Sequence, residues 1–575
     1  MEAIRMRLKI TKSKNSSSLY VIKSTYKDGK HSSKIVEKLG TYAALSEKLG
    51  GQDPIAWANE YITKLNEKEK EDHAKVMIQF SPTKLIDLEK QRTYNLGYLF
   101  LQQIYYALGL PKICEQISKK YKYEFDLNSV LSRLVYGRIL FPASKLSTYK
   151  LSSKYLEKPN FELQHVYRGL EIIAKETDFI QSQLYKNSLK LSKRNSGILY
   201  YDCTNYFFEI EQEDGIKQYG PSKEHRPNPI VQMGLFMDGD GIPLAFCMNS
   251  GNTNEQLTLK PLEQKIIKDF NLAKFIICTD AGLASNSNRI FNDQENRAFI
   301  TTQSIKKLKK YLMDWALSET DWRRGNDNIL YDISALNEEE DYDKVFFKER
   351  WVKENGLEQK MIVTFSLKYK QYQRHIRQSQ IDRANKAMAS NPEKIQKSSQ
   401  NDYKRFVKKT SITAQGETAN QAIYCLDYEL VAQEEKFDGF YAVCTNLEDD
   451  AQSIIKVNNR RWEIEDCFRV MKTEFKARPV YLQRDERIIA HFTTCFLALL
   501  VFRFLEKKLD ERFTGRDIIQ GLRDMNVVEI LGDGFIPAYS RNEFTEALHE
   551  VYGFRTDFQI NTNSHMRKVI AMTKS

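Results

Sequence analysis

The stretch Ile198–Tyr201, with the sequence ILYY, leads directly into Asp202 and marks a change in the chain from helical to strand-like patterning. Ile230–Met237 (IVQMGLFM) then meets the turn Asp238–Gly241, and Ile242–Met248 follows. Two β-rich runs around a short turn of Asp and Gly are typical of a hairpin. The segment therefore predicts three strands that pair in sequence order.

The chain beyond this hairpin alternates between helical and strand patterns. Asn254–Phe270 has helical spacing, and Phe275–Thr279 has the pattern of a buried strand. Ser285–Phe291 then predicts a short helix, and Ala298–Thr302 predicts a further strand. The order of three strands, helix, strand, helix and strand predicts an α/β fold. It is the layout of an RNase H-like core, in which an antiparallel meander precedes parallel strands joined by helices.

Two carboxylates follow predicted strands. Asp202 comes after Ile198–Tyr201, and Asp280 comes directly after Phe275–Thr279. Carboxylates at the ends of strands in an α/β sheet project into the crevice where ligands bind. A third candidate, Glu465, lies on a long helix that the pattern predicts over Gln452–Phe475.

That helix carries a polar row beside an apolar one. With Arg461 as the origin and ~100° per residue, Glu465, Lys472 and Asn458 all lie within about 60°. The neighbouring stripe is apolar and consists of Ile464, Phe468, Met471 and Phe475. The helix is expected to pack with the apolar stripe and to present a base–acid–base row to a cleft. An amphipathic helix with an Arg–Glu pair on its surface is the alternative for this helix alone.

Three carboxylates in this order suit two-metal phosphodiester chemistry. Carboxylate oxygens are good ligands for Mg²⁺, and two ions about 4 Å apart activate an attacking water or 3′-hydroxyl and stabilise the leaving oxygen. We therefore expect Asp202, Asp280 and Glu465 to be the catalytic and metal-binding residues, with two Mg²⁺ ions for which Mn²⁺ substitutes. Arg461 and Lys472 are expected to hold the phosphate backbone.

A basic cluster precedes the second predicted strand. Lys223, His225 and Arg226 lie close together in the sequence and are candidate DNA contacts. A solvent-exposed loop is the alternative.

At these residues the chain resembles the DDE transposases of bacterial insertion sequences, in the insertion sequence four-like group with a Tyr-Arg-Glu-Lys signature. The signature has the spacing Tyr-x2-Arg-x3-Glu-x6-Lys. Arg461, Glu465 and Lys472 match it in type and spacing, whereas Asn458 stands at the Tyr position. The motifs around the two Asp residues and the block between them also fit the family; they are Tyr201–Asn205, Thr279–Gly282, Gly220–Pro229 and Gly251–Thr253.

The resemblance implies a transposase that cleaves transposon ends and joins the 3′-hydroxyl to target DNA. It also implies transposon-end DNA and target DNA as partners, and a homodimer that handles two ends. In the family the Tyr and Arg are understood to grip a bent or hairpin DNA end; Asn458 can hydrogen-bond a phosphate but cannot stack, so a hairpin step stays open. The alternatives are an inactive or domesticated DNA-binding relic, a structure-selective RNase H-like nuclease, and an interaction protein.

The patterns and the resemblance together predict a domain order. A β-hairpin region (1–75), in which Leu19–Ile22 and Lys34–Leu39 flank the turn Asp28-Gly29, precedes a helical DNA-end-binding domain (90–195). The catalytic core follows in two parts, 197–302 and 437–505, with a β-rich insertion domain (303–436) between them and a C-terminal helical region (506–575) after them.

The helical domain contains more specific signals. Leu96–Leu110 and Leu127–Leu140 have helical periodicity, and Ser144 is placed to start the next helix. Arg133 and Arg138 are candidates for DNA contact, with an ordinary solvated face as the alternative.

Composition limits the class of protein less than the motifs do. The net charge of +11 favours a polyanionic partner, but charge alone does not decide it. The eight cysteines form no CxxC pair, which is typical of a reducing compartment. The N-terminus lacks the apolar core of a signal peptide, and the apolar run Cys495–Phe502 is too short to span a bilayer. We therefore expect a cytoplasmic, nucleoid-associated bacterial protein with no membrane partner.

Overall fold

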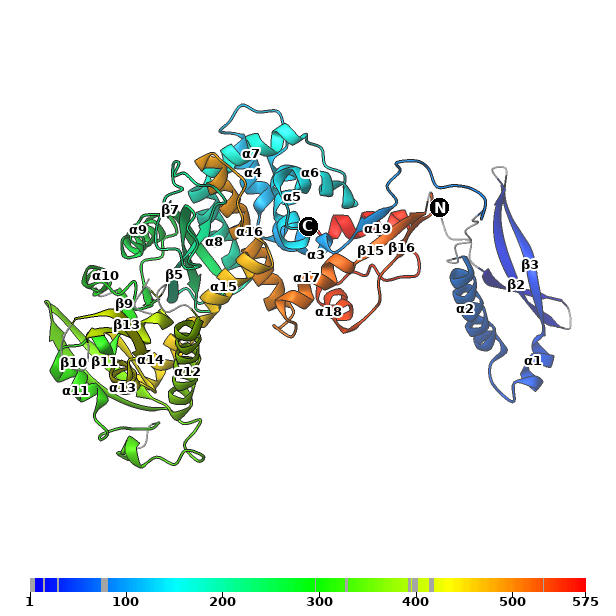
Figure 1. Cartoon of the computed structure of the whole chain (residues 1–575). Helices are drawn as coiled ribbons and strands as arrows, with labels where there is room; N and C mark the ends of the chain where they lie inside the picture. Colours follow the sequence, from blue (N-terminus) through cyan, green and yellow to red (C-terminus); the bar gives the residue numbers. More distant parts are fainter. Residues whose placement is uncertain are drawn as a thin grey trace. The chain divides into compact units, whose positions relative to one another are not determined.

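A computed structural model of the 575-residue chain describes residues 6–13, 16–27, 30–73, 81–294, 296–325, 329–390, 395, 402–412, 418–530 and 532–575 (Figure 1). The chain divides into two compact units. Unit 1 comprises Met1–Arg92, Val528–Ile536 and Asp557–Asn563, and unit 2 comprises Thr93–Val527, Pro537–Thr556 and Ser564–Ser575.

Unit 1 is built on a small antiparallel sheet. In its described part, β1 (Met6–Lys12) pairs with β2 (Ser17–Lys27), which pairs with β3 (Lys30–Thr41). Helices α1 (Tyr42–Lys48) and α2 (Pro54–His73) follow. The expected pairing of β2 with β3 is confirmed, although the turn Asp28-Gly29 lies outside the described residues. Strand β1 was not expected, although Met6, Leu8 and Ile10 alternate with polar residues as a strand requires.

Unit 2 begins with a short strand, β4 (Thr93–Asn95), and a group of helices: α3 (Tyr98–Ala107), α4 (Leu110–Ser118), α5 (Leu127–Leu140), α6 (Lys145–Leu151), α7 (Leu163–Lys175) and α8 (Thr177–Leu191). The helix expected over Leu96–Leu110 ends early because Gly109 adopts a left-handed φ of 70°. Helix α5 has the expected bounds, and the Ser144 hydroxyl caps α6 by accepting a hydrogen bond from Ser147 N.

Helix α16 (Asp485–Lys508) is the core helix of this part of unit 2 and contacts α5 and α7 (Figure 1). Among the described residues it is the one helix long and apolar enough to cross a membrane, but 89% of its most apolar stretch is buried inside the protein. The expectation that Cys495–Phe502 belongs to a buried helix is confirmed. The chain ends with α17 (Gly515–Asp524), β15 (Asn526–Ile530), β16 (Gly534–Pro537), α18 (Glu543–Tyr552) and α19 (Asn563–Met572).

The central sheet of unit 2 follows the expected order of elements. Strands β5 (Ile198–Phe207), β6 (Ile230–Asp238) and β7 (Pro243–Ser250) form an antiparallel meander. After α9 (Leu259–Asp269), strand β8 (Phe275–Thr279) lies parallel to β5; after α10 (Asn286–Phe291), β9 (Arg297–Gln303) lies parallel to β8. The mixed α/β fold is thus confirmed.

The segment expected to form a β-rich insertion domain (303–436) adds two strands to this same sheet. Its strands β10 (Phe346–Glu354) and β11 (Leu357–Phe365) join β9 through β14 (Phe440–Thr445), so the described strands of the sheet run β10-β11-β14-β9-β8-β5-β6-β7. The added strands cover the edge of β9, whose backbone groups would otherwise lack partners. All the domain boundaries, those of the insertion domain included, remain predictions.

The remaining elements of this segment are α11 (Lys310–Leu317), α12 (Leu367–Ser390), β12 (Val407–Ile412), β13 (Thr418–Leu426) and α13 (Tyr428–Glu435). Strands β12 and β13 form a hairpin of their own. Two helices follow β14, namely α14 (Ala451–Asn459) and α15 (Trp462–Thr473).

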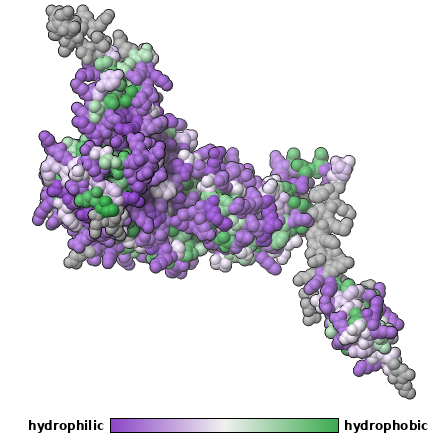
Figure 2. Space-filling view, turned by 90° about the horizontal axis from the view of Figure 1, so that it is seen from below, coloured by the Kyte–Doolittle hydropathy of each residue, from purple (hydrophilic) through white to green (hydrophobic). Residues whose placement is uncertain are grey.

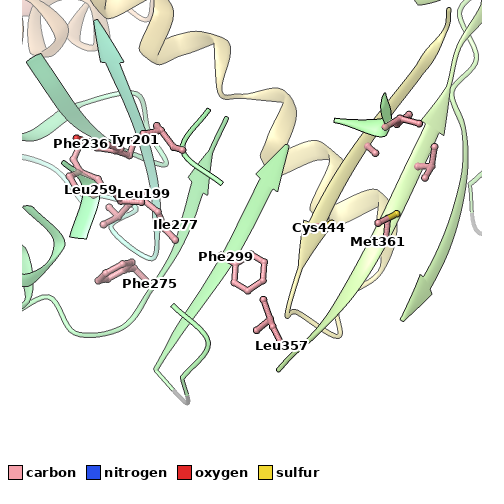
Figure 3. Close-up of a cluster of buried hydrophobic side chains, with 14 of the residues drawn as sticks. Leu199, Tyr201, Phe236, Leu259, Phe275, Ile277, Phe299, Leu357, Met361 and Cys444 are labelled. Atoms are coloured by element: carbon pink, nitrogen blue, oxygen red, sulfur yellow. The ribbon is translucent and has the colours of Figure 1, made fainter. Parts of the chain in front are cut away.

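One face of the central sheet carries a continuous apolar core. Leu199 and Tyr201 of β5, Ile277 of β8, Phe299 of β9 and Met361 of β11 belong to one buried cluster (Figure 3). Side chains of α9 cover it, including Leu259 and Leu262. The surface in Figure 2 is mostly hydrophilic with scattered apolar areas. Since side chains alternate along a strand, the residues between those of the core point to the opposite face.

Candidate active site

Asp202 and Asp280 lie side by side on neighbouring strands. In the parallel pair of β5 and β8, Tyr201 is the partner of Thr279, and each is followed directly by one of the two acids. Asp280 follows its strand as expected, but Asp202 was expected at a strand end and lies inside β5, because the strand continues to Phe207.

Both acids belong to the face of the sheet that α14 and α15 cover. On β5, the Tyr200 hydroxyl donates to Val457 O of α14 at 2.8 Å, and the Tyr206 hydroxyl lies 3.8 Å from the Met471 sulfur of α15. Asp202 lies between the two tyrosines in the sequence and is separated from each by an even number of positions, so all three side chains are on the same face of β5. Asp202 therefore points toward the two helices and away from the apolar core.

The same alternation applies on β8. The Cys278 thiol lies 3.8 Å from the Asn458 Oδ1 of α14. Asp280 comes two residues after Cys278 and therefore points to the same face of the sheet. The Asp280 Oδ1 accepts a hydrogen bond from Leu283 N at 3.0 Å, which orients its carboxylate in the turn after the strand.

The single helix expected over Gln452–Phe475 is wrong. Helix α14 ends at Asn459 and α15 begins at Trp462, so the chain turns at Arg460 and Arg461. Asn458, in the last turn of α14, is only 5% exposed. Its Nδ2 donates to the Tyr441 hydroxyl of β14 at 3.0 Å, which ties the last turn of α14 to the sheet.

Only part of the polar row predicted for this helix is therefore present in the structure. Arg461 and Glu465 do face each other, with 3.6 Å between Nη2 and Oε1. Asn458 is buried with its amide engaged, so the structure does not present it to a DNA strand. Its position instead supports the turn that carries Arg461.

Arg461 lies within electrostatic reach of all three candidate acids. Burial alone would lower the pKa of its guanidinium, but the Tyr441 hydroxyl and the carboxylates of Asp202, Glu465 and Asp280 outweigh burial and raise the pKa. Arg461 is thus a cation placed among the three acids.

The Asp202 carboxyl has an unusual environment. Only 9% of the residue is exposed, and burial is the main cause that raises its pKa to about 6, with a further contribution from the negative charge of Asp280. Lys223, the Cys203 backbone N–H and Arg461 all act in the opposite direction. The charged form is therefore costly unless cations surround it.

Two lysines approach this carboxyl from different elements. Lys223 donates to Cys203 O and lies 3.4 Å from the Glu255 carboxylate. Lys472 of α15 lies 3.5 Å from Glu224 Oε1. Burial, then repulsion by Lys223, lowers the pKa of Lys472 to about 8, while Asp202 opposes that shift. The sequence-predicted Lys223 and Lys472 are therefore brought to Asp202.

His225 and Arg226 are placed differently. Both are exposed in the loop between β5 and β6, and the Arg226 guanidinium lies 4.2 Å from the centre of the Phe207 ring. Within the described part of the chain neither residue forms an ion pair with Asp202, Asp280 or Glu465. Their contact with DNA remains a prediction.

The donor set fits a hard divalent cation in its chemistry, but the three acids are not gathered. Among the residues that the structure describes, no three His, Cys, Asp or Glu side chains form a metal-binding group. Asp202 and Asp280 are close enough to raise the pKa of Asp202, whereas Glu465 is 60% exposed and faces Arg461. Because it is exposed, the Glu465 side chain can change rotamer at little cost.

Several residues at the site were not expected from the sequence. Tyr441 contacts Asn458, and Glu224 forms ion pairs with both Lys472 and Arg478. Glu224 was visible as the acid within the Lys223–Arg226 cluster. Tyr441 had no signal beyond its place in a predicted strand.

Arg133 and Arg138 are not available for DNA. Arg133 donates to Glu157 O at 2.8 Å, and Arg138 donates to Phe475 O at 3.1 Å, and both residues are buried. Their guanidinium groups join helices and loops inside unit 2, so both candidate DNA contacts were wrong.

Residues 207–501, slightly more than half of the chain, match the family described as the transposase DDE domain. The matched range contains Asp280 and Glu465 and begins just after Asp202. No curated protein matches the sequence. Among solved structures, the cryo-EM structure of the piggyBac transposase synaptic complex with hairpin DNA is 8% identical, with a TM-score of 0.35, over 84% of this chain and 88% of that chain. That likeness is too weak to relate the two folds.

Proposed function

Because the chain belongs to the family of transposases with a DDE domain, we propose that it cleaves DNA at transposon ends and joins the resulting 3′-hydroxyl to target DNA. The observation that carries the proposal is the placement of Asp202 and Asp280 at adjacent positions of two parallel strands. The strand order β7-β6-β5-β8-β9 supports an RNase H-like core around them.

Asp202, Asp280 and Glu465 are the proposed ligands of two Mg²⁺ ions, for which Mn²⁺ substitutes. Bound ions would supply charge stabilisation for the attacking and leaving oxygens of a phosphodiester. Lys223 and Arg461 already place positive charge beside Asp202. They would also stabilise a phosphate that approaches the same carboxylates.

We assign the chain to the bacterial insertion-sequence group with the Tyr-Arg-Glu-Lys signature. Arg461 and Glu465 face each other, and Lys472 follows on α15, which supports that assignment. Asn458 does not fill the role of the signature Tyr, since it is buried. The Tyr441 hydroxyl lies beside Asn458 and acts on Arg461 from β14.

The proposed partners are transposon-end DNA and target DNA. Two ends have to be handled together, so the proposed active form is a homodimer, in a cytoplasmic, nucleoid-associated setting. In solution, a complex with two end fragments should contain two chains of 67.3 kDa each, measured by mass photometry.

The central test is a cleavage and strand-transfer assay on DNA that carries the ends flanking the gene. Wild type with Mg²⁺ should release and join 3′ ends, and EDTA should abolish both. Glu465→Gln should lower the cleavage rate by at least about 100-fold while DNA binding persists, because a metal ligand is lost. Glu463→Gln is the matched control: its carboxylate lies on the same helix but pairs with Arg460, so cleavage should be retained.

Other outcomes distinguish the alternatives. DNA binding without cleavage in every protein would favour an inactive, domesticated relic. Cleavage without joining would favour a structure-selective nuclease. Cleavage that survives Glu465→Gln would show that a different acid completes the site.

A further inference from the structure

A pocket of about 280 Å³ lies in unit 2, lined by α5, α6, α16 and the segment after α15. Its lining includes the buried Lys145 and His491 and the exposed Leu146 and Tyr481. Because buried and exposed side chains share one lining, the pocket connects the surface with the Lys145 ammonium.

The Lys145 ammonium is held in place by a neutral histidine. The His491 Nε2 lies 3.0 Å from Ala477 O, so this nitrogen carries the proton and donates to the carbonyl. Nδ1 is then the acceptor for Lys145 Nζ, at 3.4 Å. Burial, with the nearby charges of Lys145 and Arg138, lowers the pKa of His491 well below its ordinary value, which keeps the ring neutral.

Two of the three N–H donors of Lys145 have no partner among the residues that the structure describes, and no carboxylate there lies within ion-pair distance. The residue is only 5% exposed. Burial, and then repulsion from Arg138, lowers the pKa of Lys145 to about 7, with the Cys495 thiol as the opposing group. Below pH 7 Lys145 is therefore a buried cation without a counter-charge, which is unfavourable. Its position in an open pocket indicates an anionic ligand.

The pocket shares a wall with the candidate active site. Arg478 lines the pocket, forms an ion pair with Glu224 and lies over the Phe207 ring at 5.6 Å. Glu224 in turn lies 3.5 Å from Lys472. A strand of DNA bound along Lys472 would therefore pass close to the mouth of the pocket.

We propose that this pocket binds a phosphate group of the DNA on which the transposase acts, with Lys145 as the ligand inside the pocket and Arg478 at its wall. The proposal rests on DNA being the partner in the proposed function, but not on cleavage. Ammonium and guanidinium groups both donate to phosphate oxygens. A phosphate group has several acceptor oxygens, which match the unused N–H donors of Lys145.

The test compares Lys145→Met with Lys150→Met, which removes an exposed lysine from the same helix. Affinity for a transposon-end duplex is measured over a range of salt concentrations without divalent metal, so that cleavage plays no part. Loss of one phosphate contact should reduce the slope of log affinity against log salt by about 0.9 for Lys145→Met. Lys150→Met should keep the wild-type slope. Equal slopes for all three proteins would overturn the proposal.

A second measurement uses inorganic phosphate and does not depend on DNA. Phosphate should raise the thermal unfolding temperature of the wild type by about 2 °C relative to chloride at equal ionic strength. Lys145→Met should lose this shift. Without phosphate at pH 6, where Lys145 with its pKa of about 7 is charged, this variant should unfold at the wild-type temperature or above it, because an unpaired buried charge is removed. A purely structural Lys145 would give a lower temperature. Absence of a phosphate-specific shift in the wild type would overturn the pocket even if Lys145→Met failed to fold.

The two proposals fail in different ways. If the salt dependence of DNA binding is the same in the wild type and in Lys145→Met, the result contradicts the proposed pocket but not the proposed chemistry. A wild type that binds DNA through Lys145 but never cleaves would count against the proposed chemistry alone.

Discussion

At Asp202, the burial that the fold imposes opposes the negative charge that the proposed metal binding requires. The Asp202 carboxyl is buried beside Asp280, which raises its pKa from the ordinary 3.8 to about 6. Below about pH 4 the carboxyl is protonated in both the folded and the unfolded chain, so its burial carries no charge penalty. Between pH 4 and pH 6 the unfolded chain loses the proton first, and above pH 6 the folded chain bears the full penalty.

We therefore expect Asp202→Asn to stabilise the protein at pH 7.5 by roughly 2 to 3 kcal/mol and to have almost no effect at pH 4. The Asn Oδ1 keeps the hydrogen bond from Cys203 N. Urea unfolding at the two pH values, without divalent metal, measures the difference. Glu465→Gln is the control, since its exposed carboxylate should change the free energy of unfolding by less than about 1 kcal/mol at either pH. Equal stability of Asp202→Asn and wild type at pH 7.5 would contradict the assigned burial penalty.

The residue scale also shows what the sequence could and could not predict about the site. The strands that carry Asp202 and Asp280 were predictable because each acid follows a short apolar run, although β5 continues past Asp202 to Phe207. The surroundings of Arg461 were not, because Tyr441 reaches it from β14 and Lys223 reaches Asp202 from a loop. Contacts between distant segments leave no local pattern.

At the scale of elements, the junction between α14 and α15 determines where Arg461 and Glu465 point. A helical wheel treats the segment as one rod, but α14 ends at Asn459, beside the hydrogen bond from Asn458 to Tyr441. The strands over 198–302 were predicted more successfully, because each is a continuous apolar run. The addition of β10 and β11 to the same sheet depends on pairing with β14 far along the chain, which no local periodicity shows.

The junction gives a prediction of coupling. Asn458→Ala and Tyr441→Phe should each destabilise the protein by about 1 to 2 kcal/mol. Tyr441→Phe leaves the buried Asn458 amide without this partner, and Asn458→Ala removes one hydrogen bond from the Tyr441 hydroxyl, which keeps its bond with Thr302. The double variant should be less destabilised than the sum of the two by about 1 kcal/mol. Urea unfolding of the four proteins completes the double-mutant cycle, with the exposed neighbour Asn459→Ala as a near-neutral control. Strictly additive effects would show that the bond does not hold the junction.

At the scale of the whole molecule, the charge of +11 is a small difference between 87 basic and 76 acidic residues. Many of the cations are engaged inside the fold; Arg377, for instance, donates to Asp438 through both Nη atoms at 2.6 Å. The number of phosphates that the protein contacts should therefore follow from the cations at the site and not from the net charge.

Six such cations are proposed as DNA contacts, namely Lys145, Lys223, Arg226, Arg461, Lys472 and Arg478, of which Lys145 and Arg478 share one phosphate. If they neutralise about five phosphates, log affinity for duplex DNA should fall with log salt with a slope of about −4 to −5. Binding should then weaken by about 300- to 1,000-fold between 50 and 200 mM salt. Fluorescence anisotropy with a labelled end fragment measures the slope. A slope near −10 would mean that the net charge of +11 governs binding, whereas absence of DNA affinity at low salt would favour an interaction protein whose Arg–Glu pair on α15 is incidental.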